Sequence, residues 1–209
     1  MEERARGPGE RIVPGPPAAP RPAAGVALLR DGGDGPEVLL VRRTEAARFM
    51  PGVWVFPGGA VEARDGVGTG RFAACARREL HEEAGIELPA TAELTLFCRW
   101  ITPEALATRF DARFFLARAP AGAAPRPDGD EAVDAAWARP AEALDAAAAG
   151  ELALSFPTRS QLGMLAGFGA VEEALAHFRG RPVEPILPKP VGEGERLRMA
   201  LPGDPDYPG

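Results

Sequence analysis

Three glutamates, Glu79, Glu82 and Glu83, stand close together in the segment Arg78–Ile86, which reads RELHEEAGI. On a helix, neighbours at i, i+3 and i+4 share a face, so the three carboxylates would lie within roughly a quarter-turn of one another. Like charges at this spacing repel each other and weaken a helix, and a divalent cation relieves that repulsion. Hard cations such as Mg²⁺ and Mn²⁺ prefer carboxylate oxygens, and Mg²⁺ is usually shared with substrate phosphates. The segment therefore predicts a metal site for phosphate chemistry.

The stretch from Gly59 to Ile86 resembles the Nudix box. That pattern is Gly, five residues, Glu, seven residues, then Arg-Glu-aliphatic-any-Glu-Glu-any-Gly-aliphatic. Its second half matches here at every specified position, namely Arg78, Glu79, Leu80, Glu82, Glu83, Gly85 and Ile86.

The first half of the box departs from the pattern. Counted forward from Gly59, the first acid falls on Asp65; counted back from Arg78, its place falls on Gly70. The two counts differ by five residues, so the loop 65–70 is interpreted as an insertion. Either Glu62 or Asp65 could supply the missing acid.

The resemblance implies a hydrolase of a nucleoside diphosphate linked to another group, in which a metal assists the attack of water on the diphosphate. It implies that Glu79 and Glu83 ligate Mg²⁺ or Mn²⁺. Glu82 would be a third ligand or the base that orients the water, and Arg78 would hold the carboxylates in place. Glu131 is the second candidate for the general base; a plain solvated loop glutamate is the alternative interpretation.

Gly58 immediately precedes the box and Gly59 begins it, and both belong to the expected site. Gly58 and Gly59 have no side chain, so the backbone can approach the metal and the substrate closely at these positions. We expect Gly59 beside the metal and Gly58 beside the substrate.

The segment 39–59 contains a second motif: LLVRRT, three residues, Arg48, three residues, Gly52, three residues and FPGG. It resembles the signature of Nudix coenzyme A diphosphatases, and the segment 99–115 also resembles the acyl-coenzyme A branch. Guanidinium groups suit phosphate oxygens, so Arg43 and Arg48 are expected to bind the nucleotide. The alternative is that both arginines form structural ion pairs.

Three functions remain open on this basis. The first is a coenzyme A or acyl-coenzyme A diphosphatase. The second is a Nudix hydrolase of another substrate, such as ADP-ribose or a dinucleotide. The third is a non-catalytic ligand sensor, which the presence of all three box glutamates disfavours.

Composition excludes some partners. The net charge of −6 argues against nucleic acid as the main partner. There is no apolar run near 18 residues, so no membrane span is expected, and the N-terminus lacks a signal-peptide pattern, so the expected location is cytoplasmic. The two cysteines, Cys75 and Cys98, are expected to be reduced and without catalytic role.

The expected fold class is α+β, a Nudix α/β/α sandwich with a mixed sheet between helices. Residues 1–22 are expected to be a disordered arm, residues 23–180 the hydrolase domain and residues 181–209 a Pro-rich extended tail, through which a homodimer could form. Strands are expected at 24–29, 38–42, 54–56, 94–101, 113–117 and 133–138, and helices at 71–84, 140–149, 160–166 and 171–178.

Overall fold

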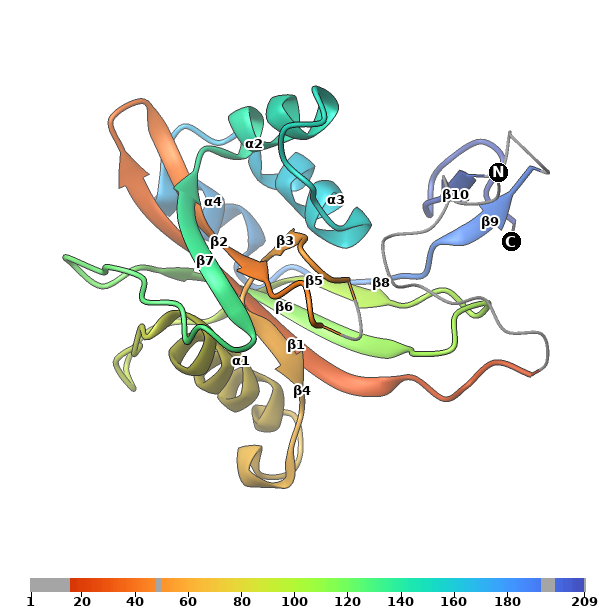
Figure 1. Ribbon diagram of the computed structural model, residues 1–209, viewed down its shortest axis with the longest axis horizontal. Coiled ribbons are helices and arrows are strands. Elements are labelled where there is room, and N and C mark those ends of the chain that lie inside the picture. Colours follow the sequence, from red (N-terminus) through yellow and green to blue (C-terminus); the bar gives the residue numbers. More distant parts are fainter. Residues whose placement is uncertain (1–15, 48–49, 193–197, 209) are drawn as a thin grey trace.

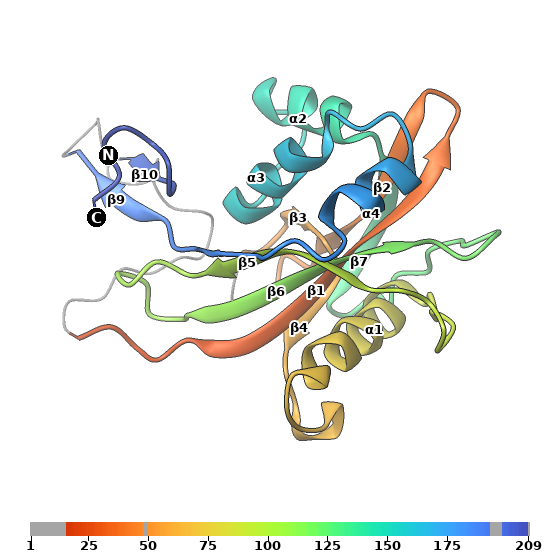
Figure 2. The ribbon, with the colours of Figure 1, turned by 180° about the vertical axis from the view of Figure 1, so that it is seen from behind.

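The computed structural model describes residues 16–47, 50–192 and 198–208, which form a mixed sheet with helices on both faces (Figure 1, Figure 2). The main path of the sheet is β3-β2-β1-β6-β5-β8, with β4 paired to β1 and β7 paired to β2. The expected α+β fold is confirmed. Its strands are β1 (Arg21–Gly32), β2 (Gly35–Arg43), β3 (Trp54–Val55), β4 (Gly58–Ala60), β5 (Thr95–Ile101), β6 (Phe110–Arg118), β7 (Ala132–Ala138) and β8 (Pro185–Ile186).

Helix α1 (Gly70–Ala84) covers one face of the sheet, and three helices cover the other (Figure 1). The three are α2 (Pro140–Ala148), α3 (Phe156–Leu165) and α4 (Val171–Phe178). Among the residues described, none of the helices combines the length and apolar content needed to cross a bilayer.

Strand β1 lies inside the sheet and is buried from residue 23 to residue 29. It pairs antiparallel with β2 and parallel with β6. A continuous apolar run is typical of a strand covered on both faces. Val26 and Leu28 pack in the core beneath α1, while Ala27 and Leu29 pack in the core beneath the other three helices. The strand thereby joins the two cores.

Helix α1 places the carboxylate cluster. It buries Phe72, Ala76 and Leu80 against the sheet and ends at Gly85, whose φ of 64° is the left-handed conformation that favours glycine. The N–H of Gly85 donates to the carbonyl of His81 at 2.9 Å.

The Gly-Gly segment forms strand β4, paired antiparallel with β1. Gly58 lies opposite Gly25, and a Cβ on Gly58 would lie only 2.7 Å from the Cα of Gly25. Glycine at both positions therefore lets the two strands approach closely enough to hold β4 against the core.

The segment beyond residue 180 differs from the expected extended tail. Strand β8 joins the main sheet parallel to β5, and β9 (Lys189–Val191) and β10 (Arg198–Ala200) form a separate antiparallel pair (Figure 1). At the other end, β1 begins at Arg21, inside the expected arm, and residues 1–15 lie outside the described part of the chain.

An ion pair joins strands β5 and β6, and from it we predict that the stability of the fold depends on pH. Arg99 donates to Asp111 through Nε at 2.8 Å and Nη2 at 2.7 Å, and this pairing lowers the pKa of Asp111 below its ordinary value of 3.8. The ionised carboxylate therefore stabilises the fold above the ordinary pKa, and this contribution is lost as the pH falls below it.

We expect Asp111→Asn to lower the free energy of unfolding at neutral pH and to matter progressively less below about pH 4. Urea unfolding of both proteins across this range measures the difference; a difference independent of pH would contradict the assignment.

Candidate active site

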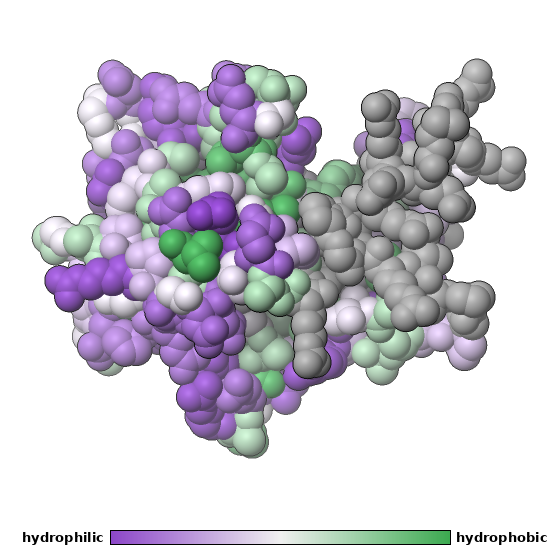
Figure 3. All heavy atoms as spheres, viewed as in Figure 1, coloured by the Kyte–Doolittle hydropathy of each residue, from purple (hydrophilic) through white to green (hydrophobic). Residues whose placement is uncertain are grey.

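A cleft of about 880 Å³ opens between β4, α1, the β5–β6 strands, the start of α3 and strand β10. On the face seen in Figure 3, hydrophilic surface is interrupted by apolar patches between the α2–α3 region and helix α1. The cleft gathers most of the residues expected from the sequence: Arg43, Gly58, Gly59, Glu62, Arg78, Glu79, Glu82 and Glu131.

Arg78 organises the acidic side chains at one end of the cleft. Its Nε and Nη2 donate to the two carboxylate oxygens of Asp65 at 2.9 and 3.0 Å. Its Nη1 donates to Glu79 at 2.7 Å and to Glu82 at 2.8 Å, and Nη2 also donates to the carbonyl of Ala60. One guanidinium thus ties three carboxylates to β4.

Of the two candidates for the missing acid, Asp65 is the one that accepts hydrogen bonds from Arg78. Its side chain is 2% exposed, and the hydrogen bonds from Arg78 hold its pKa below the ordinary value. Asp65 ends the short 3₁₀ helix Ala63–Asp65, and its Oδ2 accepts from the backbone N–H of Glu62 at 2.7 Å. Glu62 begins this turn and lies at the edge of the cleft.

Glu79 and Glu83 are the buried carboxylates of the cluster, 6% and 2% exposed. Glu83 Oε2 accepts from the backbone N–H of Gly58 at 2.9 Å. Burial raises the pKa of Glu79, and burial together with the neighbouring Glu79 charge raises the pKa of Glu83 to about 8. Two adjacent carboxylates with raised pKa values mark a place where positive charge would be favourable.

Among the residues described, no three acidic, histidine or cysteine side chains stand in an arrangement ready to hold a metal ion. Arg78 engages both Glu79 and Glu82, and the thiol of Cys75 donates to the carbonyl of Gly59. The donor chemistry nevertheless fits a hard divalent cation, because the buried carboxylates of Glu79 and Glu83 offer only oxygen ligands. These two residues would hold the ion.

The two candidates for the general base are both exposed. The side chain of Glu82 is 40% exposed; it accepts a hydrogen bond from Arg78 and forms an ion pair with Arg64 Nη1 at 3.1 Å. Glu131 lies just before β7, where Asp128 accepts from the backbone N–H of Glu131 and of Ala132 and so orders the loop. The charge of Glu131 contributes to the raised pKa values of both Glu79 and Glu83, so Glu131 lies near this buried pair.

Arg43 reaches the cleft from the end of β2. The β2–β7 register shifts between Arg42 and Arg43, and such irregularities commonly redirect a side chain next to a functional site. Positive charge at Arg43 lowers the pKa of Glu83 and so opposes the effect of burial. The other expected nucleotide-binding arginine, Arg48, lies outside the described residues.

Several cleft residues are absent from the sequence-based expectation: Arg64, Trp100, Phe110, Phe114, Phe156, Arg159, Arg198 and Met199. These residues come together through pairing between strands that are distant in sequence and through the return of the C-terminal segment to the cleft. The alternation of Phe110, Ala112 and Phe114 was a usable signal, because residues at i, i+2 and i+4 share one face of a strand.

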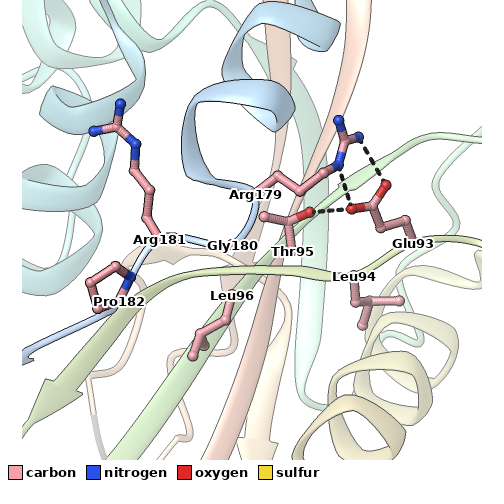
Figure 4. Close-up of a pocket in the computed structure, with 8 residues that line it drawn as sticks. All are labelled: Glu93, Leu94, Thr95, Leu96, Arg179, Gly180, Arg181 and Pro182. Carbon is pink, nitrogen blue, oxygen red and sulfur yellow. Dashed lines mark hydrogen bonds and ion pairs between the residues drawn. The ribbon is translucent and has the colours of Figure 1, made fainter.

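A second, shallower pocket of about 430 Å³ lies where the chain leaves α4 (Figure 4). Arg179 donates through Nε and Nη2 to Glu93 at 2.8 and 2.9 Å, and Thr95 Oγ1 donates to the same carboxylate. The side chain of Arg181 points away from this pair (Figure 4). The contacts fasten the end of α4 to the start of β5, and the pocket gathers no cluster of carboxylates.

Gly59→Ala is expected to reduce turnover at least tenfold. A Cβ at this position would overlap Glu79 Oε1, so the carboxylate or β4 must shift. The matched control is Gly70→Ala, because a Cβ there meets no atom within 4 Å. Steady-state kinetics of both variants, with melting temperatures, measures the effect; an active Gly59→Ala protein would show that the position of Glu79 is not critical.

Comparison with known proteins supports the resemblance of the segment from Gly59 to Ile86 to the Nudix box. The NUDIX domain family matches residues 19–156, more than half of the chain. A Caenorhabditis elegans relative that carries the name nudix hydrolase 7 is 29% identical over 211 residues, covering 80% of this chain and 68% of that protein. A crystal structure of a NUDIX hydrolase from Alicyclobacillus acidocaldarius superposes with a TM-score of 0.71 at 26% identity, covering 79% of this chain and 99% of that one.

A crystal structure of a MutT NUDIX hydrolase from Burkholderia pseudomallei is 30% identical with a TM-score of 0.52, covering 70% of this chain and 98% of that one. The family resemblance of the segment from Gly59 to Ile86 is thereby confirmed. The chain belongs to the NUDIX domain family, whose members are hydrolases acting on pyrophosphate bonds.

Proposed function

We propose that this Nudix hydrolase cleaves the diphosphate of coenzyme A or an acyl-coenzyme A, with Mg²⁺ or Mn²⁺, in the cytoplasm. The products are 3′,5′-ADP and phosphopantetheine or its acyl form. The observation that carries the proposal is the presence of Arg43, from the coenzyme A-like motif, in the same cleft as Glu79, Glu82 and Glu131. Coenzyme A bears a 3′-phosphate besides its diphosphate, and a guanidinium suits this additional anion.

The acidic end of the cleft supplies the hydrolytic chemistry. Glu79 and Glu83 hold the divalent ion, which when bound lowers the pKa of water and neutralises charge on the diphosphate. Glu82 accepts the proton of the attacking water, with Glu131 as the second candidate for this role. Arg78 keeps Glu79 and Glu82 in position, and Asp65 orients Arg78 through two hydrogen bonds.

The two glycines of β4 allow the carboxylates of α1 to pack closely against this strand. The backbone N–H of Gly58 holds Glu83, and the missing side chain of Gly59 leaves room for Glu79. We infer that the substrate diphosphate approaches the carboxylates along β4 at Gly59; the space beside Gly58 is filled by Gly25 and Ala24 of β1.

A substrate panel tests the proposal. Purified protein is incubated with Mg²⁺ or Mn²⁺ and with coenzyme A, its acetyl thioester, dephospho-coenzyme A, ADP-ribose and diadenosine tetraphosphate, and the products are identified by mass. The proposal predicts the highest kcat/KM for coenzyme A or its thioester. A clear preference for ADP-ribose or the dinucleotide would contradict the coenzyme A assignment and would leave the hydrolase assignment intact.

Arg43→Ala is expected to raise KM for coenzyme A by about tenfold or more, and to change KM for dephospho-coenzyme A much less, because only the former carries the 3′-phosphate. Because positive charge at Arg43 also lowers the pKa of Glu83, a fall in kcat common to both substrates is expected, and the difference between the two KM changes is the test. Arg181→Ala is the matched control, because Arg181 lies at the second pocket. Equal losses on both substrates would assign Arg43 a framework role.

A further inference from the structure

The cleft changes character along its length. Its acidic end carries Arg43, Arg64 and Arg78 beside the glutamates, whereas the wall formed by β5, β6 and α3 carries aromatic side chains. Phe114 marks the junction between the two ends. A Cβ on Gly25, which lies opposite Gly58, would lie 2.9 Å from the Phe114 ring and 2.9 Å from the carbonyl oxygen of Pro57.

From Phe114 the apolar wall runs along β6. Phe114, Ala112 and Phe110 alternate along this strand and line the cleft. Four residues of strand span about 13 Å, so the wall extends by about that length from the catalytic end. A group attached to the diphosphate would lie against this wall if it left the acidic end in that direction.

Two further aromatic rings widen the same wall. Trp100 on β5 is 4% exposed, and Phe156 at the start of α3 packs edge-on against it with ring centroids 5.6 Å apart. Phe156 is 38% exposed, while its partner Trp100 is anchored in the core. The pair therefore presents an apolar surface on a rigid support.

The C-terminal hairpin closes this part of the cleft. Strand β10 contributes Arg198 and Met199 to the lining, and Ala200 anchors the strand with no exposure. The hydroxyl of Tyr207 donates to the carbonyl of Leu187 at 2.8 Å, which ties the chain end back to the segment before β9. These contacts fix the hairpin in place as one wall of the cleft.

The positive charge that the hairpin brings to the cleft is engaged in ion pairs. Arg198 donates through Nη1 to Asp204 at 3.2 Å and through Nη2 to Asp206, two carboxylates that do not line the cleft. Met199, the next residue, is half-buried and apolar. Met199 lines the same cleft as the aromatic residues and suits a non-polar group better than a phosphate or a sugar.

Strand β10 also lies outside the segment 19–156 that matches the NUDIX family. We propose that Met199 is a specificity-determining residue of this chain, and that it contacts, with Trp100 and Phe156, a non-polar group carried on the diphosphate. The proposal rests on the proposed function only in placing the diphosphate at the acidic end. The substrate class is a nucleoside diphosphate ester whose elongated second group has a non-polar portion.

Binding of two probes tests this without turnover. The terminal methyl and hexyl esters of ADP, which carry the same charge, are titrated calorimetrically into the full-length protein in the presence of a chelator. Wild type is expected to bind the hexyl ester about tenfold or more tightly than the methyl ester, because burial of methylene groups is favourable. Met199→Glu should abolish this preference, with any loss caused by its added charge common to both esters, and Met199→Leu should retain it.

Pro190→Ala is the matched control, because Pro190 pairs with Met199 in the hairpin and does not line the cleft. It should retain the preference, and circular dichroism should show that all variants are folded. Equal affinities of the two probes for wild type, or binding of neither, would overturn the apolar site. An unchanged preference in Met199→Glu would overturn the role of the hairpin. Failure of coenzyme A turnover with the preference intact would remove the proposed function alone.

Discussion

Replacing Arg78 by alanine is expected to lower the free energy of unfolding by about 3–5 kcal/mol and to abolish most activity. The reason is that Asp65, whose side chain is 2% exposed, would lose its bidentate partner and remain buried as an uncompensated charge. Glu79 and Glu82 would lose their shared donor at the same time. Urea unfolding with a fitted m-value measures the first effect, and steady-state kinetics measures the second.

Two further variants separate charge pairing from general disruption. Arg64→Ala removes a surface guanidinium that also contacts Glu82, and should cost no more than about 1 kcal/mol. The double variant Arg78→Met with Asp65→Leu should recover much of the lost stability, because replacing both partners of a buried pair leaves no unpaired charge. It should not recover activity, since Glu79 and Glu82 would still lack Arg78. A double variant as unstable as Arg78→Ala would contradict this explanation.

Glu83→Gln is expected to lower kcat about a hundredfold or more while leaving the fold intact. The amide is nearly the same size and can still accept a hydrogen bond from Gly58, but it is a poorer ligand for a hard cation. Loss of several kcal/mol of transition-state stabilisation corresponds to this range, at about 1.4 kcal/mol for each factor of ten. The melting temperature should not fall, because burial already disfavours the charge and raises the pKa of Glu83 to about 8.

The matched control is Glu87→Gln, an exposed glutamate just beyond the same helix. It should behave as wild type in kcat and in melting temperature. If Glu83→Gln retained wild-type kcat at saturating Mg²⁺, Glu83 would not be a ligand, and the metal assignment of the helix face would be wrong.

The acidic end of the cleft follows from the sequence because its parts are local. Spacing along one helix places Glu79 and Glu83 on a common face, and the structure buries both beside β4. The count from Gly59 points to Asp65 as one of two candidates, and the pairing with Arg78 distinguishes it from Glu62. This choice depends on a turn whose geometry the spacing alone does not determine.

The apolar end could not be derived in the same way. Phe114 and Trp100 come together through the pairing of β5 with β6, and Met199 reaches the cleft only because the C-terminal segment returns as a hairpin. Local propensity suggested an extended tail there, because proline is frequent in that segment. Tertiary contacts made over long sequence separations decide these positions.

We propose that this chain hydrolyses the diphosphate of coenzyme A with the carboxylates of α1, and product mass after incubation of coenzyme A with the protein and Mg²⁺ in ¹⁸O-labelled water tests this. We expect 3′,5′-ADP and phosphopantetheine, one of them carrying a single ¹⁸O, with formation lost on chelation and strongly reduced in Glu83→Gln. Intact coenzyme A under conditions in which the same preparation hydrolyses another nucleoside diphosphate derivative would contradict it.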